Sequence, residues 1–164
     1  MATRKKIPPR KHPRTIMIVD VQKAFPVPPG LVEKIQRYST RFGCRIFTKF
    51  VNPTGSLFRK VLKQYSCYPG TEDTELRITP AKDDLVFVKA GYGLAPKDIA
   101  KLHQRGVKNV IVCGIDTDAC VLGVMFSLFD SGIECHLKKD LCWSSTGLHR
   151  EAVKIIEQQF PAPK

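Results

Sequence analysis

Short runs of apolar, largely β-branched residues recur along the chain and predict the strands of a buried sheet. The first run, residues 15–20, has the sequence TIMIVD and ends in an acidic residue. A run that is apolar at successive positions places hydrophobic side chains on both faces of a strand, which is typical of a sheet covered on both sides. Four later runs share this character: residues 44–50, 85–89, 109–114 and 133–138.

Between these runs, apolar residues recur at helical spacing. Leu31, Ile35, Tyr38 and Phe42 fall on one face of a predicted helix, which Gly43 ends. Serine or proline at helix starts and glycine at helix ends are further signals of this kind. Together with the spacing, they predict helices over residues 56–63, 96–105, 119–129 and 148–158.

Strand and helix therefore alternate from residue 15 onwards. Only residues 64–84 show no sustained spacing of hydrophobic residues, and they predict a long irregular segment on the surface. Strands joined through helices run parallel with right-handed crossovers. The predicted fold class is α/β: an open, mainly parallel sheet of five or six strands with helices on both faces, a Rossmann-like three-layer sandwich. A chain of 164 residues has room for one such domain, predicted over residues 15–164.

Positive charge is concentrated ahead of the first predicted strand. The formal net charge is +12, and residues 1–14 hold six Lys and Arg side chains interrupted by prolines. These residues predict a basic, disordered leader. Such a leader can bind nucleic acid or an anionic surface by releasing counterions. No aromatic residue is interleaved for base stacking, so a solvated leader is the favoured interpretation and nucleic acid is the alternative partner.

Composition narrows the function classes further. No apolar run approaches the length that crosses a bilayer, so no membrane association is expected. The first residues lack the apolar stretch of a secretory signal, which predicts a cytoplasmic location. The six cysteines include no Cys-x-x-Cys pair. They are expected to be free thiols, without a zinc knuckle or a thioredoxin motif.

Three reactive side chains lie at the ends of predicted strands. Asp20 closes the first strand, Lys89 closes the third, and Cys120 lies just beyond the fourth. In parallel sheets, function gathers at the carboxyl ends of the strands. The amino end of a helix and a nearby ammonium both favour a thiolate. A carboxylate can take the thiol proton, and backbone amides of residues 116–120 can bind an oxyanion. These are the groups that an amide hydrolase needs.

The same residues carry a resemblance to a known family. In chain order, the segments concerned are Asp20-Val21-Gln22 with Phe25, then Lys89 after a hydrophobic strand, then residues 114–121, GIDTDACV. They resemble the three signatures of the isochorismatase-like cysteine hydrolases. The resemblance implies that Asp20 is the general base, that Lys89 positions and polarises the site, and that Cys120 attacks a carbonyl carbon to form a thioester. It also implies a non-proline cis peptide at Ile115-Asp116.

Two departures from the family pattern bear on metal and on substrate. Nicotinamidase members place metal-binding Asp and His residues after the second strand, but residues 48–52 are TKFVN and no His occurs from there to Lys89. Neither a metal nor an organic cofactor is therefore expected. Asp116 stands where a small residue is usual, which makes the nucleophile loop more acidic, whereas Asp118 fits the pattern.

The predicted function is hydrolysis of a C–N bond in a small amide or carbamoyl compound, with Gln22, Phe25 and Tyr92 as pocket residues. Isochorismate-type ether hydrolysis is a weaker alternative, because a nucleophilic cysteine favours acyl chemistry. Alternatives from other classes are a non-catalytic protein that binds RNA or an acidic protein, and a thiol-dependent redox sensor. Each candidate also has an ordinary structural interpretation, as a buried cysteine, a loop cap, a strand-end lysine or a core aromatic. By analogy with related folds, a homo-oligomer is expected.

Overall fold

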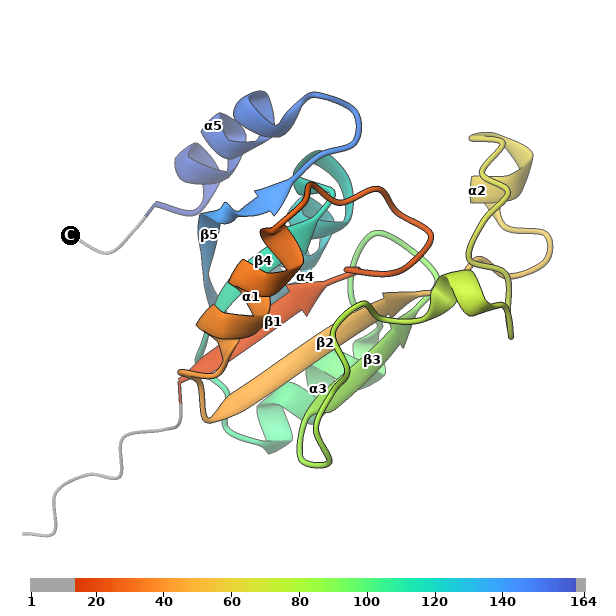
Figure 1. The fold of residues 1–164 in the computed structure, drawn as a ribbon. Helices are drawn as coiled ribbons and strands as arrows, with labels where there is room; N and C mark the ends of the chain where they lie inside the picture. Colours follow the sequence, from red (N-terminus) through yellow and green to blue (C-terminus); the bar gives the residue numbers. More distant parts are fainter. Residues whose placement is uncertain (1–13, 162–164) are drawn as a thin grey trace, which may run out of the picture.

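Five parallel strands form a sheet in the order β3-β2-β1-β4-β5 (Figure 1). The computed structural model describes residues 14–161. The strands are β1 (Thr15–Val19), β2 (Cys44–Phe50), β3 (Leu85–Lys89), β4 (Asn109–Ile115) and β5 (Glu134–Trp143). Every pairing between neighbours is parallel. The predicted α/β class is confirmed, with five strands. The predicted leader lies outside the described residues except for Arg14.

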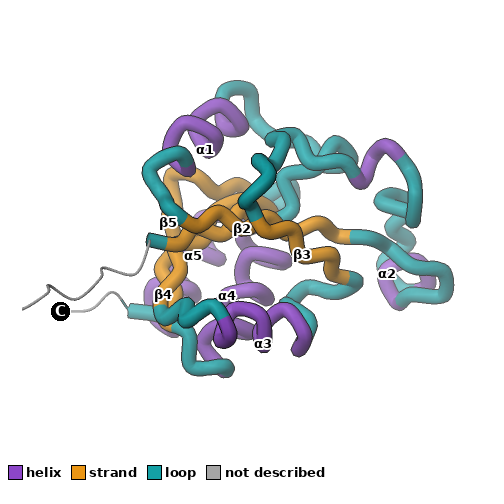
Figure 2. The backbone as a smooth tube through the Cα atoms, turned by 90° about the horizontal axis from the view of Figure 1, so that it is seen from below, coloured by secondary structure: helices purple, strands orange, loops and turns teal. Residues whose placement is uncertain are grey.

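β1 lies at the centre of the sheet because its residues can be buried on both faces. Ile16, Met17 and Ile18 are 0% exposed. One face is covered by α1 (Leu31–Ser39), and the opposite face by α3 (Pro96–Gln104) and α4 (Leu122–Asp130) (Figure 2). Two layers of helices thus remove the central strands from water, which stabilises the sheet by roughly 2 kcal/mol for each large apolar side chain buried.

The last helix, α5 (His149–Gln159), packs against β5, and the residue after it contacts α4. Phe160, directly after α5, holds this contact, because its ring centroid lies 5.2 Å from those of Phe126 and Phe129. None of the helices in the described part of the chain is long and apolar enough to span a bilayer.

The central strands approach closely where they end. Val19 of β1 pairs with Thr48 of β2 and with Gly114 of β4. A Cβ atom at Gly114 would lie 2.2 Å from the Val19 carbonyl oxygen, and the Gly114 φ is +120°. Only glycine fits both the space and the backbone conformation. This residue therefore lets β1 and β4 end side by side, with their following loops at one edge of the sheet.

Two elements near that edge differ from the prediction. β5 continues to Trp143 because pairing with β4 resumes after an irregularity, with Gly114 opposite Cys142 and Ile115 opposite Trp143. The helix expected from residue 119 begins instead as a π-helical turn, η2 (Thr117–Val121), which leads into α4.

The segment after β2 is largely irregular, as the lack of hydrophobic period in residues 64–84 predicted for its later part. It contains α2 (Leu57–Lys60), which ends before the predicted limit, and a 3-10 turn, η1 (Glu72–Thr74). α2 extends away from the sheet at the right of Figure 1. An isolated bridge between Gln22 and Leu76 ties the later part of this segment to the loop after β1.

Candidate active site

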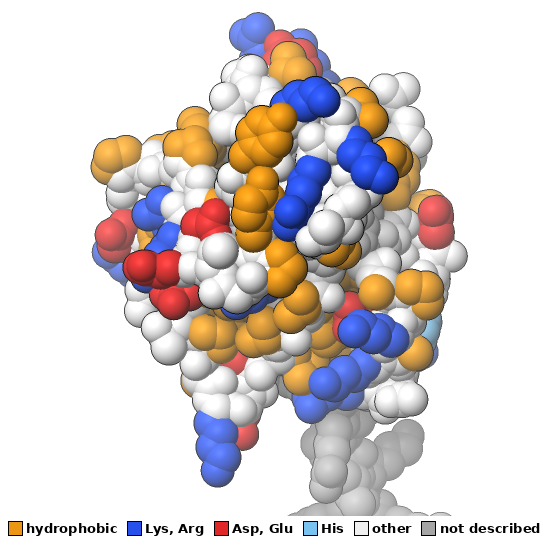
Figure 3. All heavy atoms as spheres, turned by 90° about the vertical axis from the view of Figure 1, so that its right-hand side faces the viewer, with side chains coloured by type: hydrophobic (Ala, Val, Ile, Leu, Met, Phe, Trp, Pro, Cys, Tyr) orange, Lys and Arg blue, Asp and Glu red, His pale blue; other side chains and the backbone are white. Residues whose placement is uncertain are grey.

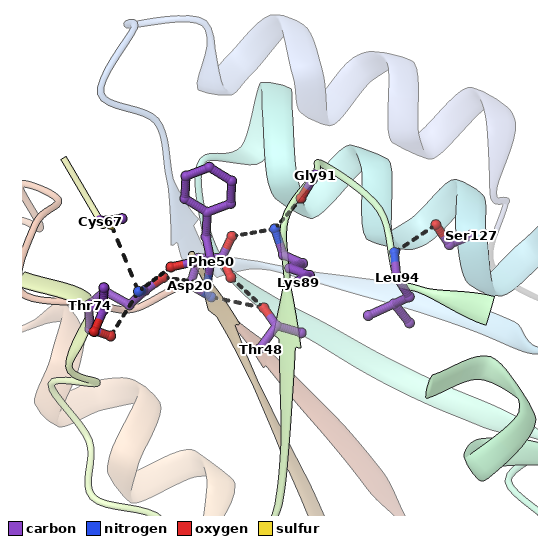
Figure 4. A network of polar contacts seen from close by, with 10 residues as sticks. Asp20, Thr48, Phe50, Cys67, Thr74, Lys89, Gly91, Leu94 and Ser127 are labelled. Carbon is purple, nitrogen blue, oxygen red and sulfur yellow. Dashed lines mark hydrogen bonds and ion pairs between the residues drawn. The ribbon is translucent and has the colours of Figure 1, made fainter. Parts of the chain in front are cut away.

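Asp20, Lys89 and Cys120 meet at the carboxyl ends of the strands. Asp20 follows β1 directly, Lys89 is the last residue of β3, and Cys120 lies in η2 after β4. Lys89 Nζ lies 2.6 Å from Asp20 Oδ2, and both side chains are 1% exposed. Cys120 as a residue is partly exposed, and its thiol lies close enough to Asp20 and Lys89 that both shift its pKa. The three residues thus form one cluster, of which Figure 4 shows the buried ion pair.

Thr48 of β2 fixes the orientation of Asp20. Its hydroxyl donates to Asp20 Oδ1 at 2.6 Å and accepts from the Asp20 backbone N–H at 3.2 Å. Asp20 also adopts the left-handed conformation, with φ +50°, which aspartate tolerates better than most residues. Because Oδ1 is held by Thr48, Oδ2 is left to face Lys89 (Figure 4).

The Lys89 side chain reaches across β2 to this carboxylate. Its ammonium also donates to the Gly91 carbonyl oxygen at 2.9 Å and lies 5.4 Å from the centroid of the Phe50 ring. Burial lowers the pKa of Lys89, but the Asp20 carboxylate and then the Cys120 thiol outweigh burial, so the net pKa is raised. Lys89 is therefore a cation at neutral pH.

The pKa of the Cys120 thiol is raised above its ordinary value. Burial is the largest cause, the Asp20 carboxylate adds to it, and the Lys89 ammonium acts in the opposite direction without prevailing. The Lys89 ammonium thus favours the thiolate as expected, but burial and the Asp20 carboxylate outweigh it, so the net pKa is raised. The physical reason is that a carboxylate shares the desolvated site, so a second negative charge is disfavoured. The resting group is a thiol beside a proton acceptor.

The turn that carries Cys120 has a fixed backbone. The Ile115-Asp116 peptide is cis, at the position that the resemblance implied. The Asp116 carbonyl oxygen accepts from the Ala119 and Val121 backbone N–H groups, each at 3.1 Å. The Ala119 amide is thereby committed to the turn. The Cys120 amide remains among the predicted oxyanion donors.

Side chains of the same turn bind the segment that follows β5. Asp116 Oδ1 accepts from the Ser145 backbone N–H at 2.9 Å, and Oδ2 accepts from the Ser145 hydroxyl at 2.6 Å. Asp118 Oδ2 accepts from the Thr146 hydroxyl at 2.8 Å. These bonds depend on the extension of β5, which brings residue 145 to the nucleophile turn.

A cavity of about 350 Å³ opens onto the cluster. Its volume is at the lower end for small-molecule sites. Aromatic rings form a continuous wall, with ring centroids 4.9 Å apart for Phe50 and Phe58 and 5.0 Å apart for Phe58 and Tyr92. Hydrophobic side chains gather in the middle of this face of the molecule (Figure 3). The lining residues are Asp20, Phe25, Phe50, Phe58, Gln64, Ser66, Tyr92, Ile115, Asp116, Ala119, Cys120 and Ser145.

Of the predicted pocket residues, Phe25 and Tyr92 line the cavity and Gln22 does not. Gln22 is 0% exposed, and its amide is used in full by backbone groups. Nε2 donates to the carbonyl oxygens of Phe50 and Thr74 at 2.9 Å, and Oε1 accepts from the Phe50 N–H at 2.8 Å. The substrate role expected for Gln22 is therefore corrected to a structural one, because it joins the end of β2 to η1.

Several residues of the site were missed by sequence reasoning. Phe50 is the last residue of β2, so the strand-end rule that found Asp20 and Lys89 also applies to it. Phe58 follows Ser56, which caps α2 by accepting from the Arg59 N–H at 3.2 Å, but no pattern aims its ring at the cavity. Gln64, Ser66 and Ser145 lie in irregular segments without a sequence signal.

Comparison with known proteins decides the family. The model of the Isochorismatase domain matches residues 16–163. The chain belongs to the isochorismatase family. An isochorismatase domain-containing protein 2 from Rattus norvegicus is 32% identical over 65 residues, covering 38% of this chain and 30% of that protein. The secreted isochorismatase effector Isc1 from Phytophthora sojae is 31% identical over 106 residues, covering 60% and 50%. The matched part thus spans half or less of these relatives.

Solved structures share the fold of this isochorismatase-family chain over nearly their whole length. An isochorismatase-like hydrolase from Alkaliphilus metalliredigens has a TM-score of 0.79 at 14% identity, covering 90% of this chain and 91% of that one. The pyrazinamidase of Pyrococcus horikoshii in complex with zinc has a TM-score of 0.77 at 21% identity, covering 90% and 96%. Nicotinamidase PncA from Bacillus subtilis has a TM-score of 0.77 at 17% identity, covering 92% and 98%.

The residues of this chain do not fit a metal such as zinc after β2. No group of three or more His, Cys, Asp or Glu side chains among residues 14–161 is arranged to hold an ion. Asn52 is 0% exposed, and its side chain is already occupied. Oδ1 accepts from Ser56 Oγ at 2.5 Å, and Nδ2 donates to the carbonyl oxygens of Gln64 and Ser66. This polar position stabilises the loop that carries α2.

Proposed function

We propose that this isochorismatase-family protein is a cysteine-dependent hydrolase that cleaves a C–N bond of a small amide or carbamoyl compound through a thioester. The observation that carries the proposal is the convergence of a thiol, a carboxylate and an ammonium at one small cavity. Nucleophile and base adjacent to each other, with the base oriented by further groups, are the arrangement required for covalent catalysis.

In the first half of the reaction, Cys120 Sγ attacks the carbonyl carbon while its proton passes to the Asp20 carboxylate. The backbone amide of Cys120 binds the oxyanion that forms. Asp20 then gives the proton to the leaving nitrogen as the C–N bond breaks, which releases ammonia or an amine and leaves an acyl thioester on Cys120.

In the second half, water attacks the thioester carbonyl. Asp20 accepts a proton from the water, and the thiol regains a proton as the C–S bond breaks. The product is a carboxylic acid, and the residues return to their resting state. Atoms and protons balance over the cycle, so the residues of the chain suffice without a redox step.

The raised pKa of Cys120 supports a general-base route in this proposal. A resting thiol requires a proton acceptor at the moment of attack, and Asp20 is the adjacent carboxylate. Lys89 has two roles. It holds Asp20 Oδ2 in place, and it lowers the pKa of Cys120, which stabilises negative charge on sulfur as the proton departs.

Ammonia release from a panel of small amides tests the proposal. Cys120→Ala is expected to abolish release from any substrate that the wild type hydrolyses. Cys44→Ala is the matched control, because Cys44 is also a partly exposed free cysteine but begins β2 at the opposite edge of the sheet. Full activity in Cys120→Ala would contradict the mechanism, whereas a wild type that releases ammonia from no amide of the panel would favour the non-catalytic binding protein.

Self-association and a role for the leader are separate proposals. A homo-oligomer is expected from analogy with related folds, and light scattering on a gel-filtration column measures it directly. Binding of RNA through residues 1–14 is the less favoured partner assignment. Filter binding with the full chain and with a chain that starts at residue 15 distinguishes a leader effect from one of the folded domain.

A further inference from the structure

The fixed charge inside the cavity is negative. Among its lining residues, the ionised side chains are the carboxylates of Asp20 and Asp116, and none is Lys, Arg or His. Asp20 is neutralised by its ion pair with Lys89. Asp116 belongs to none of the ion pairs formed within residues 14–161; it is held by the N–H and hydroxyl of Ser145 instead. The carboxylate of Asp116 is therefore the uncompensated charge among the residues that line the cavity.

The wall of the cavity suits a positive charge as well. Phe50, Phe58 and Tyr92 form its continuous aromatic part, and Phe25 contributes a fourth ring. The faces of aromatic rings carry partial negative charge and attract ammonium groups, most strongly where water is excluded. Flat molecules also stack against such rings at little cost in conformational entropy. Carboxylate and rings thus favour the same kind of ligand.

The Lys and Arg side chains on the same face do not reverse the preference of the cavity for a positively charged ligand. Lys and Arg side chains stand beside the hydrophobic ones in Figure 3. Arg59, the neighbour of Phe58 in sequence, is turned to other partners. Its Nη2 donates to the Asn52 carbonyl oxygen at 2.6 Å, and its guanidinium lies 3.6 Å from the centroid of the Tyr68 ring. Charges outside the cavity act through solvent and are screened by salt, whereas Asp116 lines the cavity itself.

We infer that Asp116 is a specificity-determining residue, and that the cavity selects flat amides whose acyl part carries a positive charge over those that carry a carboxylate. This inference rests on the proposed hydrolase function. Asp116 precedes Cys120 by four residues in the same turn and lines the same cavity, so its charge acts on the acyl part while the thiol attacks the carbonyl. Asp116 acts on binding and orientation, and no proton transfer is assigned to it.

Three amides of one shape and different charge test the inference. They are 4-(aminomethyl)benzamide, 4-(hydroxymethyl)benzamide and 4-carboxybenzamide, which are cationic, neutral and anionic at neutral pH. We expect kcat/KM to fall in that order, by about tenfold from the cationic to the neutral amide, as for one charge near a partly desolvated carboxylate. Salt at 1 M is expected to reduce the ratio.

Asp116→Asn is the decisive variant. It keeps the shape of the side chain, can still accept from the Ser145 N–H, and can donate to the Ser145 hydroxyl. The ratio of cationic to neutral kcat/KM is expected to fall to about one. Asp118→Asn is the matched control, because Asp118 also binds a hydroxyl of the segment after β5 but does not line the cavity. It should leave the ratio unchanged.

The inference is overturned if the anionic amide is the best substrate, or if Asp116→Asn retains the cationic preference. If the wild type hydrolyses none of the three amides, the proposed function fails for flat amides. The charge preference of the cavity is then tested by ligand binding alone. Calorimetry with Cys120→Ala then compares benzylamine, benzyl alcohol and benzoate. Tightest binding of benzylamine, lost in the Cys120→Ala, Asp116→Asn double variant, supports the inference. Tightest binding of benzoate contradicts it.

Discussion

The Lys89 ammonium lies 2.6 Å from the Asp20 carboxylate, and both side chains are 1% exposed. Removing two such charges from water costs several kcal/mol for each ion. Their mutual attraction and the hydrogen bonds to the Thr48 hydroxyl and the Gly91 carbonyl offset this cost. A buried ion pair is seldom the most stable choice for a fold. The role proposed for the pair in the reaction of the adjacent Cys120 thiol gives a reason for its burial.

The stability of the pair can be measured by a double-mutant cycle. Lys89→Met removes one charge and leaves the Asp20 carboxylate buried without its partner, which is expected to lower the free energy of unfolding by about 3–5 kcal/mol. Adding Asp20→Asn removes the second charge and should restore much of that loss. Urea unfolding measures all four proteins. Costs that simply add in the double variant would mean that the two residues are not coupled.

Alkylation of Cys120 in the wild type tests its raised pKa. A pKa above the ordinary value means a smaller thiolate fraction at any given pH. We therefore expect iodoacetamide to label Cys120 more slowly at neutral pH than it labels a small free thiol. The rate should continue to rise as the pH passes about 9, the ordinary value for a thiol. Labelling that is fast and already at its plateau at neutral pH would show a resting thiolate.

Asp20→Asn separates thiolate formation from catalysis. The Asp20 carboxylate raises the pKa of Cys120, and Lys89 lowers it, so removing the carboxylate should lower that pKa. Labelling at neutral pH is then expected to become faster than in the wild type, while hydrolysis falls by at least about 100-fold because the general base is gone. Mass spectrometry and ammonia release give the two rates. Slower labelling together with lost hydrolysis would indicate a collapsed site.

Gln22→Leu tests the structural role assigned to that residue. The change leaves the N–H and C=O of Phe50 and the C=O of Thr74 without a partner in a buried region. A loss of about 2–4 kcal/mol in the free energy of unfolding is expected. Lys23→Met at the next position is the control, because Lys23 forms exposed ion pairs that contribute little. Equal unfolding midpoints for the two variants would refute the role.

The strand-end rule explains how much of the site could be predicted. Asp20 and Lys89 lie at fixed positions relative to hydrophobic runs, and parallel pairing brings such ends to one edge. Gln22 comes three residues after the end of β1, in a loop, where the pattern no longer determines which way a side chain points. Ser145 was missed because the predicted strand ends at residue 138, whereas β5 continues to Trp143.

The pKa of Cys120 could not be predicted from sequence either. The sequence indicates a helix start and a nearby lysine, which both favour a thiolate. The direction of the net pKa shift depends instead on burial and on the distance to Asp20, which only the three-dimensional arrangement provides. Similarly, the aromatic wall depends on Phe58 in α2, and the helix predicted over residues 56–63 does not determine that this ring faces the cavity.

Mass spectrometry of the protein quenched in acid during turnover tests the central claim most directly. With an amide that the wild type hydrolyses, the account predicts an added mass equal to the acyl group, located on the peptide that contains Cys120. The Cys44→Ala control should show the same adduct, and Cys120→Ala should show neither adduct nor ammonia release. Ammonia release from Cys120→Ala at the wild-type rate, without an adduct in either protein, would contradict the thioester mechanism.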